Sequence, residues 1–257
     1  MRFGIEIETI SDISQSECAR LIDEHFWEQG KEGRVDIRNH YYHGHNVNQY
    51  GFEYDGSLRT DHDHPHQVEI ITPPLRLHQL GELKEIFDVL KGHLAINRSC
   101  GIHVHVEVPS GQALRQIVRI WYKFENEIIK IFPPSRRNNG YCQRLRSISD
   151  CEHLVSCQYG RHSMLNKCCY WQNGTVEFRG HSASLNYRKI KRWVFFCLSL
   201  VKKAIEYETR TRALKVALED CSEGDCLTFL EIEKKTANYL NGRIKHFENG
   251  GLESCAA

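Results

Sequence analysis

The chain has 257 residues, of which 40% are hydrophobic and 26% are charged, and its formal net charge at pH 7 is +1. This length suffices for a substantial core, and we predict a single catalytic domain over residues 1–257. Because the positive and negative charges nearly balance, the composition gives no evidence for nucleic acid, a polyanion or a membrane surface as partner. The oligomeric state stays unknown at this level.

The N-terminus and the apolar segments predict a cytoplasmic protein. Met1 is followed at once by the alternating pattern from Phe3 to Glu8, which leaves no room for a signal peptide. No apolar run approaches the roughly eighteen residues that a membrane-spanning helix needs. The chain has 11 cysteines, an odd number without an export signal, so we expect reduced thiols rather than a disulfide framework. A structural zinc site is the alternative, with Cys142, Cys151, His153 and Cys157 as its candidate ligands.

The first half of the chain alternates between strand and helix patterns. In chain order we predict a strand over 3–9, a helix over 14–26 capped by Ser14 or Asp12, a hairpin at Asp55-Gly56, a strand that ends at Ile71, a helix over 77–90, a strand over 101–108 and a helix over 113–132. Pro73-Pro74 ends the strand at Ile71, because proline supplies no backbone donor.

The second half is predicted to be mainly helical. A polar loop or lid over 133–160 is followed by a strand over 175–179, a long helix over 187–218 and another helix over 227–240. We therefore expect a helical C-terminal part over 187–248, followed by a frayed tail.

Four of the predicted strands share an unusual polar face. Side chains alternate across a strand, so each strand divides into an apolar and a polar face. The polar faces carry Glu6, Glu8, Glu69, His103, His105, Glu177 and Arg179. A solvated outer face is the ordinary explanation of such alternation, but glutamate is depleted in strands. Glu6 and Glu8 would lie about 7 Å apart on one strand, and gathered like charges are unfavourable without a cation.

This set of residue types predicts a metal and phosphate site. Carboxylates with one or two imidazoles suit Mg²⁺ or Mn²⁺ better than zinc, which prefers thiolate and imidazole. Arg179, two residues from Glu177, would meet a phosphoryl group bound to that metal, because guanidinium matches phosphate oxygens bidentately. Together these groups are typical of phosphoryl transfer.

Two other interpretations stay open. A metal-dependent hydrolase would use the His-x-His pair with Glu6 and Glu69, and it would bind zinc or manganese but no nucleotide. A non-catalytic binding protein with the same fold would retain the same residues without turnover. Metal analysis together with an ATP-binding titration would distinguish this hydrolase from an enzyme of phosphoryl transfer.

Five sequence blocks resemble the signature of the amidoligase family, within the superfamily of glutamine synthetase and glutamate-cysteine ligase. They read FGIEIE from Phe3, YDGSL from Tyr54, VEIITPPL from Val68, CGIHVHVEVP from Cys100 and GTVEFRGHSASLN from Gly174. The resemblance covers the chain to about Asn186. It implies an α+β fold similar to the glutamine synthetase catalytic domain, with a curved, mostly antiparallel sheet and helices packed on its apolar face.

The resemblance also implies a role for each polar residue. Glu6, Glu8, Glu69, His103 and Glu177 match metal ligands, Arg179 matches a phosphate contact and His105 a nucleotide or substrate contact. Arg161 and Asn166 match a block that holds nucleotide or substrate. Asp55 matches a block in which it either binds substrate or caps a turn, and it joins Glu177 and Arg179 as a catalytic candidate.

The implied activity is an ATP- and Mg²⁺-dependent ligase (Mn²⁺ is the alternative ion) that joins a small-molecule or peptide carboxylate to an amine through an acyl phosphate. The identity of the two substrates is open. The His-rich insert over 61–66 departs from the family pattern and is either a second metal-binding loop or a solvated tip, with the latter preferred.

Overall fold

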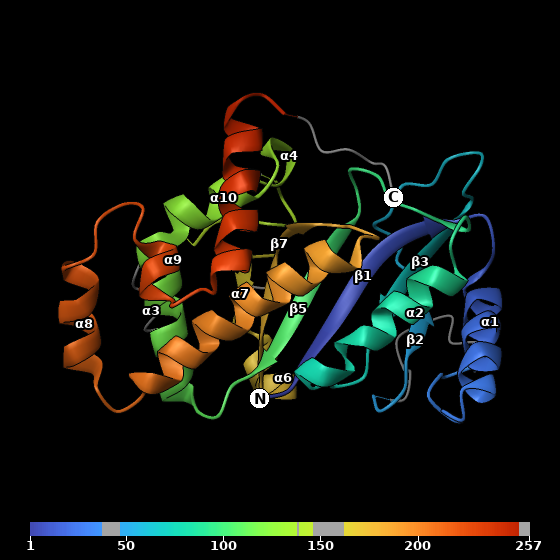
Figure 1. Cartoon of the computed structure of the whole chain (residues 1–257), viewed down its shortest axis with the longest axis horizontal. Coiled ribbons are helices and arrows are strands. Elements are labelled where there is room, and N and C mark those ends of the chain that lie inside the picture. Colours follow the sequence, from blue (N-terminus) through green and yellow to red (C-terminus); the bar gives the residue numbers. More distant parts are fainter. Residues whose placement is uncertain (38–46, 138, 146–161, 252–257) are drawn as a thin grey trace. The chain divides into compact units, whose positions relative to one another are not determined.

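The computed structural model describes residues 1–37, 47–137, 139–145 and 162–251, and it confirms the α+β class with a mostly antiparallel sheet (Figure 1). The chain divides into two compact units. The N-terminal unit contains Arg2–His103 and Ser182–Lys191, and the C-terminal unit contains Val104–His181 and Arg192–Glu253. The single-domain organisation stays a prediction. No helix in the described parts of the chain combines the length and apolar character needed to cross a membrane.

The strands of the N-terminal unit are built around β1. They are β1 (Phe3–Ser11), β2 (Gly51–Glu53), β3 (His66–Ile71), β4 (Leu94–Ala95) and the start of β5 (Gly101–Glu107). β3 pairs antiparallel with both β1 and β2, and β4 pairs with the end of β1. Ile7 lies opposite Ile70, and both are fully buried on the apolar face. The polar residues that alternate with them therefore share the opposite face.

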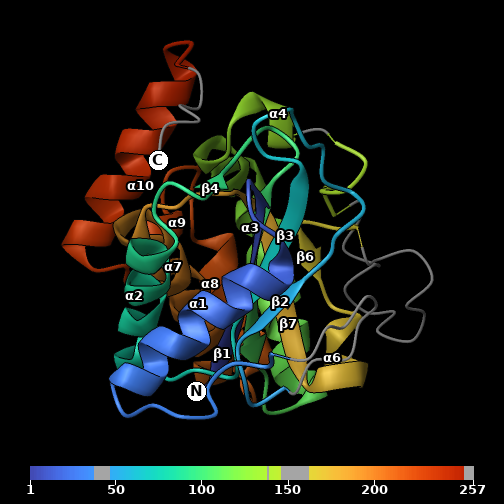
Figure 2. The ribbon, with the colours of Figure 1, turned by 90° about the vertical axis from the view of Figure 1, so that its right-hand side faces the viewer.

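The helices of this unit are α1 (Gln15–Glu28), the short 3₁₀ helix η1 (Leu77–Gly81) and α2 (Glu82–Val89). The Ser14 side chain accepts from the Glu17 backbone N–H, which confirms Ser14 as the N-cap of α1. α1 contacts α2, β2 and β3 (Figure 2). Burial of Ile22 and Phe26 fixes α1 in place, because apolar burial is the main favourable contribution to packing.

In the C-terminal unit a long amphipathic helix packs against a strand. Its first elements are the continuation of β5, α3 (Gly111–Ile128), η2 (Ile129–Ile131), α4 (Pro134–Arg137), β6 (Leu165–Asn166), α6 (Cys169–Asn173) and β7 (Thr175–Ser182). Ser110 caps α3 by accepting from the Ala113 backbone N–H. The buried Trp121 of α3 packs on Phe178 of β7 with ring centroids 5.7 Å apart. This contact fixes the strand that presents Glu177 and Arg179.

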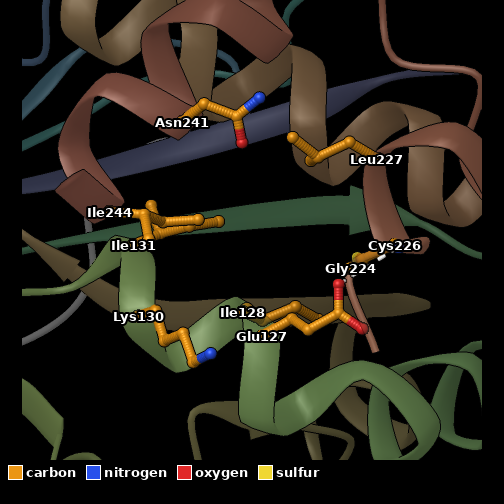
Figure 3. Close-up of a pocket in the computed structure, with 9 residues that line it drawn as sticks. All are labelled: Glu127, Ile128, Lys130, Ile131, Gly224, Cys226, Leu227, Asn241 and Ile244. Carbon is orange, nitrogen blue, oxygen red and sulfur yellow. Dashed lines mark hydrogen bonds between the residues drawn. The ribbon is translucent and has the colours of Figure 1, made fainter. Parts of the chain in front are cut away.

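The predicted helices over 187–218 and 227–240 are each wrong in extent. The helices in this part are α7 (Tyr187–Glu206), α8 (Thr211–Glu219), α9 (Cys226–Phe229) and α10 (Lys234–Glu248). α7 ends at Glu206, whose carbonyl accepts from the Arg210 guanidinium. The backbone at Glu231 has φ of 53°, which an α-helix does not tolerate, so the predicted second helix divides into α9 and α10. α9, α10, η2 and the end of α3 line a small pocket of about 190 Å³ (Figure 3).

Two loop predictions also change. The Asp55-Gly56 turn exists, since the Asp55 side chain accepts from the Ser57 backbone N–H at 2.8 Å, but 57–58 are not a strand. β2 pairs instead with β3, which begins only at His66.

In the predicted lid, α4 and the bridges at 139–145 are described, while residues 146–161 lie outside the described residues. The zinc candidates Cys151, His153 and Cys157 fall in that range.

We predict that Gly180→Ala destabilises the fold by about 1–3 kcal/mol, because overpacking a filled core forces neighbouring groups apart. A Cβ at Gly180 would overlap the ring of Phe132, which is fully buried and packs edge-on against Trp193 at 5.4 Å. Urea unfolding measures the change. The control is Gly242→Ala on the exposed face of α10, where no atom lies within 4 Å and alanine should stabilise by up to about 1 kcal/mol. Equal stability of wild type and Gly180→Ala would contradict the packing.

Candidate functional site

Three carboxylates lie side by side across three strands of the N-terminal unit. The register places Glu69 of β3 directly opposite Glu8 of β1 and directly opposite Glu53 of β2. Side chains at paired positions point to the same face, with Cβ atoms about 5 Å apart. Glu8 is 6% exposed and Glu53 is 4% exposed. Buried glutamates are rare unless they are paired or bind a cation, and Glu8 and Glu69 of this row belong to a group of donor atoms that could hold a metal ion.

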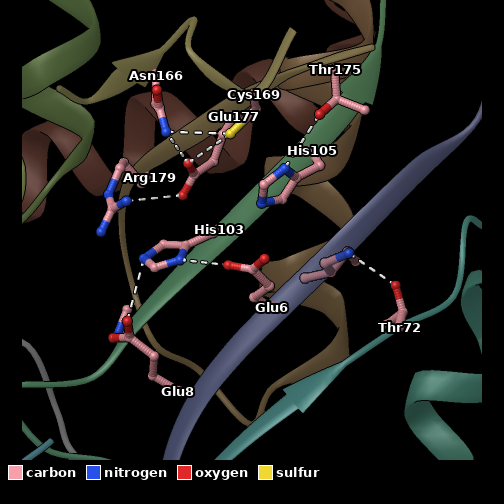
Figure 4. Close-up of polar contacts among 12 residues, drawn as sticks. Glu6, Glu8, Thr72, His103, His105, Asn166, Cys169, Thr175, Glu177 and Arg179 are labelled. Carbon is pink, nitrogen blue, oxygen red and sulfur yellow. Dashed lines mark hydrogen bonds and ion pairs between the residues drawn. The ribbon is translucent and has the colours of Figure 1, made fainter. Parts of the chain in front are cut away.

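A histidine lies between two of the carboxylates on the neighbouring strand. The Nδ1 atom of His103 is 3.0 Å from Glu6 Oε2, and its Nε2 atom is 3.4 Å from Glu8 Oε1 (Figure 4). A neutral imidazole carries only one N–H, so it can donate to one of these carboxylates while its other nitrogen faces an acceptor. A cation between the imidazole and that carboxylate would bind both. The buried His103 thus fits a ligand position.

Backbone groups hold the carboxylates in position. The backbone N–H of Gly101, at the start of β5, donates to Glu8 Oε2. Asp55 accepts from the Ser57 N–H, so the turn after β2 fixes its carboxylate. Glu69, Glu6 and His103 form one group whose donor atoms lie within 4.8 Å of one another, and Glu8, Asp55 and Glu69 form another. Glu69 belongs to both groups, so one carboxylate can serve two neighbouring cation positions.

The electrostatics of Glu69 show how crowded these acids are. Burial raises the pKa of Glu69 well above its ordinary value, and the neighbouring Glu6, Glu8, Asp55 and Glu53 carboxylates raise this pKa further. A divalent cation between them would reverse this effect, since it favours the ionised form of each ligand. The donor set is oxygen-rich with one imidazole, which fits Mg²⁺ or Mn²⁺.

A second polar cluster lies in the C-terminal unit around Glu177. Glu177 is 3% exposed, and its Oε1 atom pairs with Arg179 Nη1 at 3.2 Å. Its Oε2 atom accepts from Asn166 Nδ2 at 2.6 Å and from Cys169 Sγ at 3.4 Å (Figure 4). Asn166 and Glu177 are paired residues of β6 and β7. The cluster holds the Glu177 carboxylate and the Arg179 guanidinium in fixed orientations.

Two further groups fix the backbone of this strand. Arg136 of α4 donates from Nη2 to the Arg179 carbonyl at 2.9 Å, and Cys142 Sγ lies 3.4 Å from the same oxygen. Burial raises the pKa of Cys142 to about 11. His105 of β5 lies with Nδ1 3.5 Å from Thr175 Oγ1. His105 therefore lies beside β7, the strand that carries Glu177.

The structure gathers most of the predicted residues into these two clusters. Glu6, Glu8, Glu69, His103 and Asp55 lie together in the N-terminal unit. Glu177, Arg179 and Asn166 lie together in the C-terminal unit. Arg161 lies outside the described residues. The roles assigned to all of these residues stay predictions, and Asn166 makes a direct contact with Glu177 that the sequence did not indicate.

Sequence reasoning missed Glu53 and Cys169. Glu53 alternates with the core residue Phe52, and this is the same signal that identified Glu69, but the short strand was read only as part of a hairpin. Cys169 gave no signal, because a single cysteine in a helix is usually a small apolar residue. In the His-rich insert, His62 is fully exposed and His64 contacts Asp61 at 3.1 Å.

Residues 1–151 match a family model described as "Putative amidoligase enzyme". The chain belongs to this amidoligase family. The match covers more than half of the chain and includes the acid row and both histidines of β5, whereas Glu177 and Arg179 lie beyond it. The name of this family describes ligases that join a carboxylate to an amine.

A search of solved structures finds a bifunctional glutathione synthetase from Pasteurella multocida, with 12% identity and a TM-score of 0.43. The match covers 96% of this amidoligase and 47% of that protein. The chain therefore spans about half the length of the solved structure it matches. No curated protein matches the chain.

We predict that Glu69→Gln makes the metal-free protein more stable at pH 7–8 by about 1 kcal/mol or more. The unfolded chain releases the Glu69 proton near pH 4.5, while the folded chain holds it to higher pH. The free energy of unfolding of the wild type thus falls as pH rises above about 4.5, and the loss persists above the folded pKa. Thermal unfolding from pH 4 to 8 in EDTA measures this loss.

Mg²⁺ should raise the melting temperature of the wild type and should raise that of Glu69→Gln less, because the variant loses a ligand of both groups. The control is Glu28→Gln on the exposed end of α1, which should behave as the wild type. A wild type that gains no stability from Mg²⁺ or Mn²⁺ would exclude a metal site at the acid row.

Proposed function

We propose that this amidoligase is an ATP-dependent carboxylate-amine ligase that requires Mg²⁺ or Mn²⁺ and forms its amide through an acyl phosphate. The observation that carries the proposal is the row of Glu8, Glu69 and Glu53 on one face of the sheet, of which Glu8 and Glu53 are buried, with the buried His103 beside it. Such a concentration of negative charge is unfavourable in a sheet unless cations bind there. Family membership supports amide formation, and the donor set supports a metal-bound nucleotide.

The residues of the N-terminal unit would hold the metal. Glu6, Glu69 and His103 would bind one ion, and Glu8, Asp55 and Glu69 would bind a second. When bound, the ions neutralise charge on the nucleotide phosphates and on the phosphoryl group in transfer. The Gly101 N–H would keep the Glu8 carboxylate oriented, because backbone donors fix one of its two oxygens.

The residues of the C-terminal unit would contact phosphate and nucleotide. Arg179 is held by the Glu177 carboxylate through Nη1, and its other guanidinium N–H groups suit phosphate oxygens. Asn166 would position Glu177, in addition to its predicted contact with nucleotide or substrate. Glu177 is also a predicted metal ligand, in addition to Glu6, Glu8, Glu69 and His103. His105 and Arg161 stay predicted nucleotide or substrate contacts.

The proposed reaction has two steps. An oxygen of the substrate carboxylate attacks the γ-phosphorus of ATP, the bond to the β-phosphate oxygen breaks, and ADP leaves. An amine then attacks the carbonyl carbon of the acyl phosphate, inorganic phosphate leaves with the electron pair, and the amine releases a proton. Arg179 would stabilise the negative charge that develops on the transferring group and on the leaving phosphate. No covalent bond to the chain is required, so we assign no cysteine a role as a nucleophile.

We predict that Glu6→Gln and Arg179→Ala each reduce amine-dependent release of ADP and phosphate by at least about a hundredfold, because each removes a group that acts on the transferring phosphate. The assay uses purified protein with ATP, Mg²⁺ and pooled small carboxylates, peptides and amines. Matched controls are Glu24→Gln on α1 and Arg115→Ala on α3, both exposed, and both should retain activity.

Full activity in Glu6→Gln or Arg179→Ala would exclude the proposed site. A protein that binds zinc but shows no ATP affinity in a titration would favour the hydrolase instead. Nucleotide binding without amine-dependent turnover on any pool would favour a non-catalytic binding protein. The predicted cytoplasmic location is a separate expectation, which fractionation of cells would test.

A further inference from the structure

An open groove of about 810 Å³ lies in the C-terminal unit, between α3 and α8 and beside Arg144 and Leu145. One wall is a stripe on α3 with helical spacing, formed by Arg119, Tyr122, Lys123 and Asn126. The other wall is a stripe on α8, formed by Thr211, Lys215, Leu218 and Glu219. Neither stripe belongs to the acid row or to the cluster around Glu177.

Side-chain hydrogen bonds fix one end of the two walls against each other. Gln112 and Gln116 of α3 both donate to the Thr211 hydroxyl at 2.8 Å. Gln116 also donates to the Tyr207 carbonyl at 3.2 Å, just before α8 begins. The groove is therefore a preformed feature, and a ligand would not have to order these helices on binding.

The lining of the groove has a net positive charge, since it contains Arg119, Lys123, Arg144 and Lys215 together with Glu125 and Glu219. Lys123 and Lys215 make no hydrogen bond or ion pair with any described residue. The buried Glu125 accepts from Trp121 Nε1 at 3.1 Å and from the Leu145 N–H at 2.8 Å, and Arg144 Nε lies 3.5 Å from it. Because Glu125 is already satisfied, it offers a ligand little negative charge.

We propose that this groove binds an acidic peptide segment of another protein. Carboxylates of the peptide would pair with Lys123 and Lys215 across the groove, and its apolar side chains would pack on Tyr122 and Leu218. The volume suits a segment of several residues, since ligand sites of about 300–1,000 Å³ are typical. The mixture of separate cations and apolar surface fits an acidic peptide better than a phosphate backbone, which requires continuous positive charge.

The test is fluorescence anisotropy on the full chain with a fluorescein-labelled peptide of about ten residues, built from glutamate and leucine. We expect saturable binding that weakens as salt rises, because charge pairs of this kind are screened. Lys123→Glu combined with Lys215→Glu should weaken binding at least tenfold. The matched control reverses two exposed lysines outside the groove, Lys130 at the small pocket and Lys234 on α10, and should change affinity less than threefold.

Three results would overturn the proposal. The first is no saturable binding of the peptide by the wild type. The second is equal weakening by the groove variant and the control, because net charge alone would then explain binding. The third is a single-stranded RNA of similar length that binds more tightly and displaces the peptide. Amine-dependent ADP release should be unchanged in the groove variant, so the outcome is independent of the proposed ligase reaction.

Discussion

The mutual repulsion of buried carboxylates is the constraint on which the candidate site depends. Glu8, Glu69 and Glu53 occupy paired positions on three adjacent strands, so their charges cannot separate without breaking the sheet. Burial and the neighbouring acids hold the pKa of Glu69 high. A divalent cation would favour the ionised form of these acids, and a carboxyl with a pKa perturbed in this way is a reason to look for function at that place.

The same strands that impose the repulsion also orient the ligands. The antiparallel pairing fixes which residues face each other, and the opposite face of the same strands is filled by fully buried Ile7, Val68 and Ile70. A shift of one residue would exchange the two faces, so the hydrophobic core sets the geometry of the polar site. The site and the core are consequences of one alternating pattern.

The cluster around Glu177 differs in that it contains an arginine. Arg179, Asn166 and Cys169 all contact its carboxylate, which makes this cluster an oriented group rather than a repelling one. An oriented arginine suits a transferring phosphate, whose charge changes during the reaction. The groove on α3 and α8 uses a third arrangement, in which Lys123 and Lys215 make no ion pair within the described residues, and this suits the proposed recognition of an acidic segment.

The sequence by itself determined the strands that carry Glu6, Glu8, Glu69 and His103, because a period of two is a local signal that needs no knowledge of contacts. It also determined the α+β class and the amidoligase family. The ends of the helices were harder to predict from the sequence. The break near Arg210, for example, involves a hydrogen bond from its side chain to the Glu206 carbonyl. Only the tertiary structure decided that Glu53 joins the acid row and that Asn166 and Cys169 hold Glu177. The pairing of β2 with β3 places Glu53, the pairing of β6 with β7 places Asn166, and the short helix α6 places Cys169, so all three depend on the folded chain.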